Sequence, residues 1–265
     1  MPTYVASCWH GQVLDEAFDL FLGSRCVGCD LPGRMLCPGC RDALAARPRV
    51  AWPTPVPDGL VTPWVAAAYD GAVRALVVGH KDRGQWGHRR VLGDLLAQAV
   101  QGAAADLDPC VPLLLVPVPS RPGAGRRRGY EATEALVRRA AFRVRRERPA
   151  AVVTLLVSRG AADQAGLDAG GRAANVAGSM HCPSATLARA GRRWRRAHVL
   201  VCDDVVTTGS TAREAQRALE SVGLPPVAVA AVAATRRRAG PAAAPAGLPL
   251  GPTGDPLVGP GTGRG

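Results

Sequence analysis

Two adjacent carboxylates, Asp203 and Asp204, are the residues whose types and spacing best suit chemistry in this sequence. They follow an apolar run, Val199–Cys202, and precede a loop rich in hydroxyl groups and glycine, Thr207–Thr211. Carboxylate oxygens suit the hydroxyl groups of a sugar or a hard cation such as Mg²⁺. The backbone N–H groups of such a loop, at the start of a helix, suit a phosphate. The segment therefore predicts a pocket with the shape of ribose 5-phosphate.

A strand, a turn and a helix must position these groups. We expect a buried strand over Val199–Cys202 and a helix from about Ser210 to Val222. Thr211 and Glu214 have the spacing of a capping box, which favours a helix start there. The alternative is a strand–turn–helix in which the aspartate pair is incidental. Burying carboxylates at the end of a strand costs free energy, however, so such a pair is expected to have a purpose.

Four cysteines form a second candidate site. Two Cys-x-x-Cys pairs supply them: Cys26, Cys29, Cys37 and Cys40. Four thiolates in two such pairs make a closed tetrahedral zinc site, which has no open position for catalysis. The loop between the pairs has little apolar core, so metal binding, worth about 10 kcal/mol, would supply most of its folding energy. The alternative is a redox dithiol or disulfide pair.

The overall composition fits a protein that binds a polyanion. The chain of 265 residues has a net charge of +12, and only Lys81 among its 33 basic residues is a lysine. This charge is compatible with nucleic acid but does not require it, because a phosphorylated ligand would also fit. No apolar run has the roughly 18 residues of a membrane span, and no signal peptide opens the chain. We therefore expect no membrane insertion and a cytoplasmic location. Cys8 lies outside the two Cys-x-x-Cys pairs, and we expect it to be a spare thiol.

Strands and helices alternate along the chain, which predicts an α/β fold with a parallel sheet. We expect the strands Trp64–Tyr69, Leu113–Pro119, Val199–Cys202 and Pro226–Ala234, and Val152–Val157 is another strand or an apolar segment. Between the first of these strands and Val152 we expect three helices: Ala72–Val78, Arg90–Gln101 and Tyr130–Arg146. A proline-rich stretch, 47–63, is a stiff linker or a covering segment, and we place a domain boundary there. The expected parts are an N-terminal helix and zinc-binding module over 1–55, an α/β domain over 56–239, and a disordered tail over 240–265.

Basic residues elsewhere could complete the phosphate pocket. Lys81 offers a compact ammonium for a phosphate, unless it is a chance surface lysine. Arg126–Arg128 follow an expected strand at the sheet edge where ligands bind, and they either contact pyrophosphate or form an ordinary charged loop. The polar, glycine-rich stretch 158–177 is typical of a mobile lid. Arg192–Arg196, which includes Trp194, could serve a single nucleic-acid strand.

The segment Val199–Thr211 resembles the loop that binds phosphoribosyl pyrophosphate (PRPP) in type I phosphoribosyltransferases. Over about residues 20–238 the order of motifs resembles the competence protein F family, in which a double zinc ribbon precedes a phosphoribosyltransferase domain. The other motifs that carry this resemblance are the two Cys-x-x-Cys pairs, Tyr69-Asp-Gly71, Lys81, Val116–Pro119, Arg128-Gly-Tyr130, Gln164, Arg172 and Asn175.

The resemblance implies a type I phosphoribosyltransferase fold, a structural Zn²⁺ and a Mg²⁺ that binds with PRPP. It implies that the aspartate pair holds the ribose diol and helps to place Mg²⁺. The 5-phosphate would be held by Thr207, Thr208, Gly209, Ser210 and Thr211. The departing pyrophosphate would be stabilised by Arg128, Lys81 and Arg172, while the lid around Gln164 would exclude water.

Two positions depart from the family pattern. Glu131-Ala132 stand where the family usually has Asn-Gln, and Thr207 stands where purine-salvage relatives have an aspartate. Thr207 therefore argues against a hypoxanthine or guanine transferase. Three hypotheses stay open: a phosphoribosyltransferase with an unassigned acceptor, a factor that handles single-stranded DNA with other DNA-uptake proteins during natural transformation, and a regulator that senses PRPP without turnover.

Overall fold

The computed structural model describes residues 25–44, 47–120, 129–158 and 178–235. Its strands are β1 (Arg49–Val50), β2 (Pro63–Ala68), β3 (Leu113–Pro117), β4 (Ala150–Val152), β5 (Val157–Ser158), β6 (Met180–His181), β7 (His198–Val206) and β8 (Ala228–Ala234). Its helices are α2 (Pro38–Ala43), α3 (Gly71–Asp82), α4 (His88–Ala103), α6 (Ala132–Val144), α7 (Ser184–Arg193) and α8 (Ser210–Glu220). Several expected features lie outside the described residues: Cys8, the N-terminal helix, Arg126–Arg128, Gln164, Arg172, Asn175 and the tail over 240–265.

Six strands form one mostly parallel sheet in the order β1-β2-β8-β7-β3-β4. Only β1 runs antiparallel to its neighbour in this sheet. Every residue of β3 and of β8 is buried, as expected for parallel strands that are covered on both faces. The predicted α/β fold with a parallel sheet is therefore confirmed. Strands β5 and β6 form a separate antiparallel pair.

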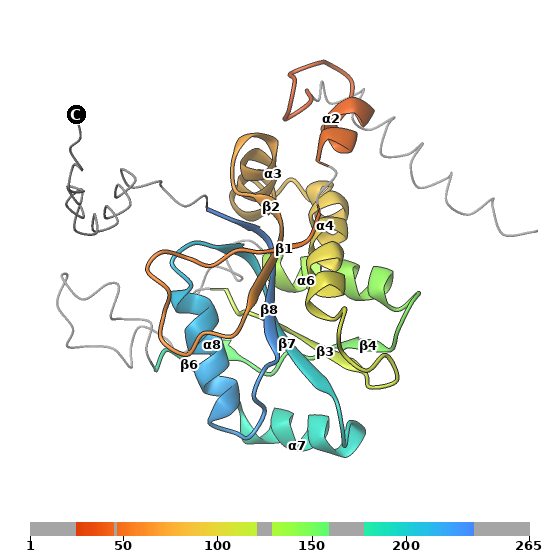
Figure 1. The fold of residues 1–265 in the computed structure, drawn as a ribbon. Helices are drawn as coiled ribbons and strands as arrows, with labels where there is room; N and C mark the ends of the chain where they lie inside the picture. Colours follow the sequence, from red (N-terminus) through yellow and green to blue (C-terminus); the bar gives the residue numbers. More distant parts are fainter. Residues whose placement is uncertain (1–24, 45–46, 121–128, 159–177, 236–265) are drawn as a thin grey trace, which may run out of the picture.

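Helices cover the two faces of the sheet (Figure 1). Leu76 of α3 and Leu136 of α6 belong to one hydrophobic core, while Leu219 of α8 belongs to a second. Neighbouring residues of β7 point into different cores, Leu200 into the first and Val201 into the second. The two cores therefore lie on opposite faces of the sheet. None of the helices in the described ranges is long and apolar enough to cross a membrane.

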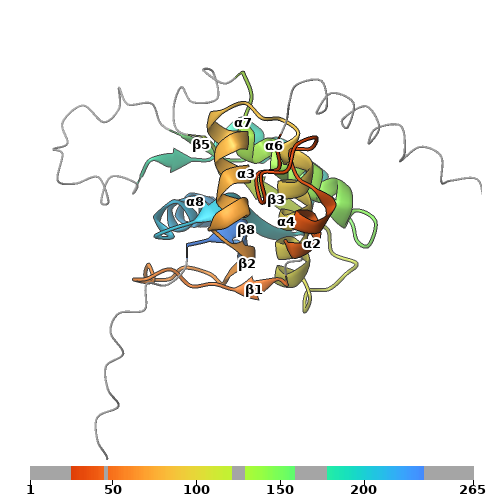
Figure 2. The same cartoon turned by 90° about the horizontal axis from the view of Figure 1, so that it is seen from above.

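The adjacent strands β3 and β7 form a topological switch point. After β3 the next helix in the described residues is α6, on the face of the first core, whereas after β7 the next helix is α8, on the other face. Figure 2 shows α8 on one side of the sheet and α4 and α6 on the other. Parallel strands whose connections diverge in this way leave a crevice at their carboxyl ends, which is where open α/β sheets bind ligands. The fold thus favours a site at the end of β7.

The proline-rich segment between β1 and β2 is held against α8 by several hydrogen bonds. The buried amide of Gln216 accepts from the N–H of Val61 at 3.0 Å and donates to the carbonyl of Gly59 at 2.8 Å. The guanidinium of Arg213 donates to the carbonyl of Asp58 at 2.8 Å. These contacts make the segment part of the covering of α8 rather than a free spacer.

One strand end expected from the sequence was wrong, and one open prediction is resolved. β7 does not stop at Cys202 but continues through the aspartates to Val206, because Asp203 keeps its register with Ala231 of β8. The stretch Val152–Val157, predicted as a strand or an apolar segment, is not one strand: β4 ends at Val152, and the chain then leaves the main sheet to form β5. Apolar content alone does not reveal this change of sheet.

Candidate functional site

The aspartate pair lies near the carboxyl end of β7, at the switch point. Both residues are buried, with 8% of the surface of Asp203 and 6% of that of Asp204 exposed. One oxygen of Asp203 accepts from the N–H of Asp204 at 2.8 Å, and one oxygen of Asp204 accepts from the N–H of Val205 at 2.9 Å. Backbone amides at the end of the strand thus fix both carboxylates.

Lys81 reaches this pair from the last turn of α3. Its Nζ donates to Oδ2 of Asp204 at 2.7 Å, although the two residues are separated by 123 positions in the sequence. The lysine side chain is 41% exposed, whereas the aspartate side chain is only 8% exposed. The ammonium therefore stands at the solvent side of a buried carboxylate. The structure brings together the sole lysine and the aspartate pair, as a shared ligand site would require.

The electrostatics of the pair favour binding of a cation. Burial raises the pKa of Asp203 well above its ordinary value, and the neighbouring charge of Asp204 raises it further. The charge of Lys81 acts in the opposite direction but does not cancel these effects. A second positive charge beside the pair would relieve the repulsion between the two carboxylates. These carboxylates therefore provide oxygen ligands that suit Mg²⁺.

The loop Thr207–Thr211 leads from β7 into α8. Gly209 has a φ of 75°, and a Cβ there would lie 2.9 Å from Cγ of Pro53 in the covering segment, so the position requires glycine. The hydroxyl oxygens of Thr208 and Ser210 are 3.0 Å apart. Three side chains of the loop are exposed: Thr207, Thr208 and Thr211. Solvent-facing hydroxyl groups at the start of a helix, beside its backbone N–H groups, provide suitable donors for a phosphate.

The capping box expected at Thr211 and Glu214 is wrong. The N-cap of α8 is Gly209, which has no side chain, and the N–H of Ser210 donates instead to the hydroxyl of Thr208 at 3.4 Å. Glu214 instead accepts from the N–H of Met180 at 2.9 Å and from two nitrogens of Arg217 at 2.8 and 2.9 Å. Burial acts to raise the pKa of Glu214, but the hydrogen bonds from Arg217 and Met180 lower it overall. Glu214 therefore joins β6 to α8 and does not cap the helix start.

Tyr130 and His80 form a contact that sequence reasoning missed. The Tyr130 hydroxyl donates to the carbonyl oxygen of His80, and the two rings meet edge-on with their centroids 5.5 Å apart. Nε2 of His80 also lies 3.2 Å from the carbonyl oxygen of Ala132. Because His80 directly precedes Lys81, these contacts fix the turn that carries the lysine. Tyr130 was visible as an aromatic after Arg-Gly, but no local pattern indicated its partner.

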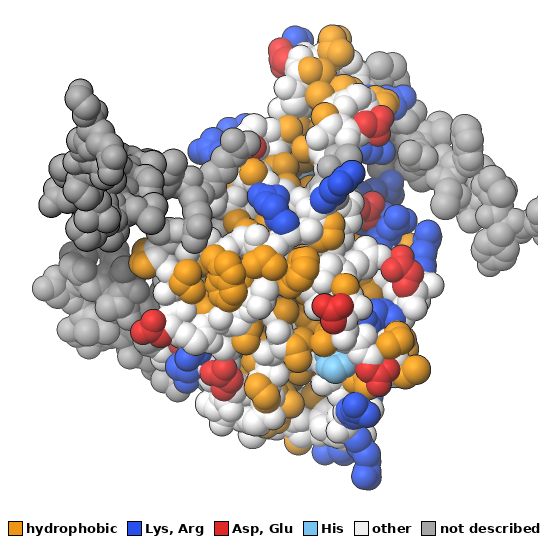
Figure 3. Space-filling model, in the orientation of Figure 1, with side chains coloured by type: hydrophobic (Ala, Val, Ile, Leu, Met, Phe, Trp, Pro, Cys, Tyr) orange, Lys and Arg blue, Asp and Glu red, His pale blue; other side chains and the backbone are white. Residues whose placement is uncertain are grey.

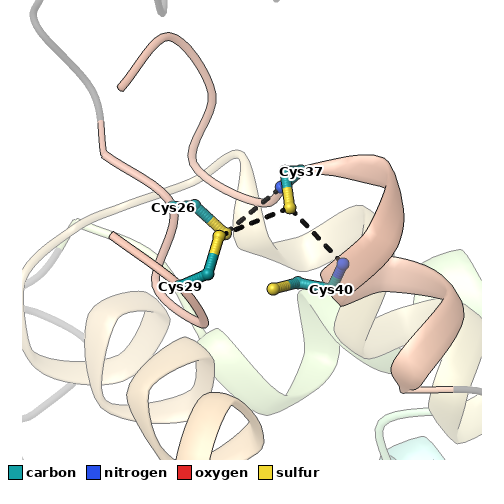
Figure 4. Close-up of side chains that lie close together, drawn as sticks. All are labelled: Cys26, Cys29, Cys37 and Cys40. Atoms are coloured by element: carbon teal, nitrogen blue, oxygen red, sulfur yellow. Dashed lines mark hydrogen bonds between the residues drawn. The ribbon is translucent and has the colours of Figure 1, made fainter. Parts of the chain in front are cut away.

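The four clustered cysteines face one another, as Figure 4 shows. All four Sγ atoms lie within 4.8 Å of one another, and those of Cys29 and Cys37 are 3.6 Å apart. Sulfurs around a tetrahedral zinc ion, with Zn–S bonds of about 2.3 Å, are roughly 3.8 Å apart. The residues are free cysteines. The cluster could therefore hold a metal ion such as zinc.

The local backbone explains why these cysteines converge. The N–H of Cys37 donates to the sulfur of Cys26 at 3.3 Å, and the N–H of Cys40 donates to the sulfur of Cys37 at 3.4 Å. Gly28 leaves room for the turn, since a Cβ there would lie 2.7 Å from the sulfur of Cys40. Burial acts to raise the pKa of Cys26, but the backbone N–H groups, that of Cys37 first, bring this pKa down to about 6. The site thus favours formation of a thiolate, the form that binds metal.

The cysteine module packs on the helices that lead to the aspartate site. Cys26 and Leu36 belong to the same buried core as α3 and α4. The terminal methyl group of Met35 packs on Gly87, the N-cap of α4. Figure 1 shows α2 beside the ends of α3 and α4. The module therefore supports the helix whose last turn carries Lys81.

The described structure does not bring the remaining predicted site residues to the aspartate pair. Arg128, Arg172 and Gln164 lie outside the described residues. Arg192–Arg196 end α7 and precede β7, which places them at the amino end of the sheet, opposite the aspartates. Trp194 is half-buried against the second core, and the guanidinium of Arg193 lies 5.1 Å from the centre of its ring. The arginines are exposed, but the indole is largely used in packing.

No protein-family model matches the chain, and no curated protein matches it. The structure alone supports the α/β fold and the cysteine cluster. The resemblance to the competence protein F family and the type I phosphoribosyltransferase fold stay predictions from the sequence.

Proposed function

We propose that this protein binds PRPP with Mg²⁺ at the switch point and transfers its phosphoribosyl group to an acceptor. The observation that carries this proposal is the arrangement at the end of β7. A buried carboxylate pair, Asp203 and Asp204, lies with Lys81 at its solvent side and is followed by the open helix start at Thr207–Thr211. A diol, a divalent cation and two phosphate groups are the ligand parts that such a site can hold together.

Each group then has one role. The loop Thr207–Thr211 binds the 5-phosphate through backbone N–H and hydroxyl donors, and the aspartate pair binds the ribose hydroxyls. Mg²⁺ held with PRPP supplies positive charge to the departing pyrophosphate. Lys81 exchanges its contact with Asp204 for the pyrophosphate, which its exposed side chain allows. Arg128 and Arg172 are proposed to add charge at the same group. The reaction thus relies on position and electrostatics rather than on a covalent enzyme intermediate.

The cysteine cluster has a separate role in this proposal. Zn²⁺ bound by all four thiolates has no open position, so its contribution is to the folding of residues 25–44. Because this module packs on α3 and α4, it also supports the position of Lys81.

Calorimetric titration with PRPP, with and without Mg²⁺, tests the site. We expect magnesium-dependent binding to the wild-type protein and none to a variant with both Asp203→Asn and Asp204→Asn. Asp94→Asn is the matched control, because Asp94 is also a carboxylate in ion pairs, with Arg139 and Arg143 between α4 and α6. Absence of heat with the wild type, or unchanged heat with the double variant, would refute the proposal.

Turnover separates an enzyme from a sensor of PRPP. A transferase releases pyrophosphate only when a suitable acceptor is present. We therefore propose to measure pyrophosphate release with a panel of nitrogen heterocycles and amines. Tight PRPP binding without release for any acceptor would favour the regulatory alternative.

A second candidate function is binding of single-stranded nucleic acid, such as DNA during uptake. It is favoured by four exposed arginines on and after α7: Arg192, Arg193, Arg195 and Arg196. Affinity that falls with salt, and that falls further when these four residues are changed to alanine, is the expected result. Affinity that is independent of salt would count against this candidate. It would leave the PRPP proposal intact, since the two sites lie at opposite ends of the strands.

A further inference from the structure

The covering segment, residues 51–62 between β1 and β2, forms a wall beside the loop Thr207–Thr211, which we call the phosphate loop. Gly209, the glycine of this loop, turns the side on which a Cβ would stand towards apolar side chains of the segment. The nearest atoms would lie 2.9, 3.2 and 3.2 Å from such a Cβ, and they belong to Pro53, Pro57 and Leu60. The position of the phosphate loop therefore depends on the position of the segment.

Gln216 of α8 holds the covering segment from the inside of the protein. Its side chain is buried, with 2% of the residue exposed. Its oxygen accepts from the N–H of Val61 at 3.0 Å, and its nitrogen donates to the carbonyl of Gly59 at 2.8 Å and to Oε1 of Glu220 at 2.7 Å. A buried amide costs free energy unless its donors and acceptor are paired, and the segment supplies two of these three partners. Gln216 thus joins α8 to the backbone of the segment.

The start of α8 is bound to both the loop and the segment. Gln216 lies about two helical turns after Gly209. Between them, the N–H of Arg213 donates to the carbonyl of Gly209 at 2.9 Å, while its guanidinium donates to the carbonyl of Asp58 at 2.8 Å. Figure 1 shows the segment, in orange, beside α8. The helix, the segment and the loop therefore form one closed set of contacts.

We propose that Gln216 positions the phosphate loop through the covering segment. Its hydrogen bonds fix the segment, and the apolar wall of the segment then keeps Gly209 in the turn of φ 75° that begins α8. This inference rests on the proposed function, which assigns the loop to the 5-phosphate. Backbone N–H groups bind a phosphate most tightly when they are held in place before it arrives, because no order is then lost on binding. Gln216 is a positioning residue, since it acts through the segment.

Titration of the full-length protein with ribose 5-phosphate, followed by the amide resonances of isotope-labelled glycine, tests the inference. In the wild type we expect the Gly209 resonance to shift as the ligand binds. Gln216→Met keeps the length of the side chain but loses its hydrogen bonds. It should weaken binding by about 10-fold, the effect of one lost hydrogen bond to a charged ligand. It should also displace the Gly209 resonance before any ligand is added, which a loss of stability alone would not do.

Pro53→Ala is the second variant, because it removes the atom nearest to Gly209 and leaves every hydrogen bond of Gln216 in place. It should weaken binding in the same direction by a smaller factor. The outer side of the segment supplies the matched control. Apolar side chains gather there at the surface (Figure 3), and Val56 is 45% exposed. Val56→Ala removes none of the three atoms nearest to Gly209 and should bind as the wild type does.

Val137→Ala controls for stability, because Val137 is buried in the first core, on the other face of the sheet. It should lower the melting temperature without weakening the binding of ribose 5-phosphate. If Gln216→Met binds this ligand as tightly as the wild type, the positioning role is refuted while PRPP binding still stands. If Gln216→Met does not fold, wild-type affinity in Pro53→Ala refutes the role in the same way. If the wild type binds neither ribose 5-phosphate nor PRPP, the proposed function fails and this inference fails with it.

Discussion

The aspartate pair and the cysteine cluster both gather groups that become anionic, but they differ in what balances the charge. Asp204 has a cation from the chain itself, the ammonium of Lys81 at 2.7 Å. At the cysteine cluster the neighbouring thiols oppose one another: those of Cys37, Cys29 and Cys26, in that order, help to raise the pKa of Cys40 to about 12. The carboxylates can therefore exist without a bound ion, whereas four thiolates need one. This difference separates a site suited to exchanging ligands from one suited to a permanent ion.

The largest expected effect is the loss of the metal from the cysteine cluster. Removing zinc with a chelator, or changing Cys26→Ser, should remove about 10 kcal/mol of local folding energy and unfold residues 25–44. Because Cys26 and Leu36 share the core of α3 and α4, the melting temperature of the whole protein should also fall. Metal analysis and thermal unfolding measure the two effects.

The matched control for the cysteine change is Cys110→Ser, at an exposed cysteine that does not belong to the cluster. It should retain one equivalent of zinc and the wild-type melting temperature. Purified wild-type protein with well under one equivalent of metal would remove the basis of the comparison.

The next effect concerns the glycine on which the phosphate loop depends. Gly209→Ala should destabilise the protein by about 1–2 kcal/mol for the positive φ and by a further 1–3 kcal/mol or so for the clash with Pro53. Gly223→Ala is the control, since Gly223 has the same φ of 75° but nothing within 4 Å of its Cβ position. Denaturant unfolding of both variants isolates the packing contribution. Equal losses would mean that the covering segment does not restrain the loop.

A smaller effect, of opposite sign, is expected at the aspartate pair. Asp203→Asn removes a buried carboxylate whose presence is unfavourable, so it should raise the unfolding free energy at neutral pH by about 0.5–2 kcal/mol. The same change should abolish binding of PRPP with Mg²⁺. A variant that is less stable than the wild type would contradict the assigned electrostatics.

The pH dependence follows from the raised pKa of Asp203. The folded protein retains a proton on this carboxyl at pH values where the unfolded chain has released it. The contribution of Asp203 to stability therefore falls as the pH rises from the ordinary carboxyl range towards the raised pKa. Thermal unfolding from acidic to neutral pH should show a growing advantage of Asp203→Asn over the wild type.

The smallest stability effect is expected for Lys81→Met, which removes the built-in cation but keeps an unbranched side chain. Because the lysine is 41% exposed, solvent screens its ion pair, and we expect a loss of about 1 kcal/mol. Affinity for PRPP should also decrease. Arg83→Met, at an exposed cation just beyond the end of α3, is the matched control and should change neither quantity. If the two variants behave alike, Lys81 has no special role.

The sequence predicted the parts of the fold that depend on local patterns. Apolar runs with short helices between them indicated β2, β3, β7 and β8, and two Cys-x-x-Cys pairs predicted the cluster that the structure contains. The predictions that were wrong depend on partners far along the chain. Glu214 has capping-box spacing, but it is used by Met180 and Arg217 because β6 places Met180 against α8.

In the candidate site, too, the local features were predicted from the sequence and the long-range contacts were not. Asp203, Asp204 and the loop after them were visible as one motif, because a single strand–turn–helix carries them. The contacts of Lys81 with Asp204 and of Tyr130 with His80 span 123 and 50 positions. Sequence spacing carries no information about such pairs, and only the packing of α3 on the sheet determines them.

The two-residue strand β1 has a consequence for how the chain could be divided. It pairs with Trp64 and Val65 of β2 and forms one outer edge of the sheet, while three-residue β4 forms the other. Very short outer strands limit the row of open N–H and C=O groups that could recruit another chain. A fragment that begins at residue 56 would lack β1 and expose the six-residue edge of β2. Such a fragment should self-associate, so expression of the α/β part alone should begin before Arg49.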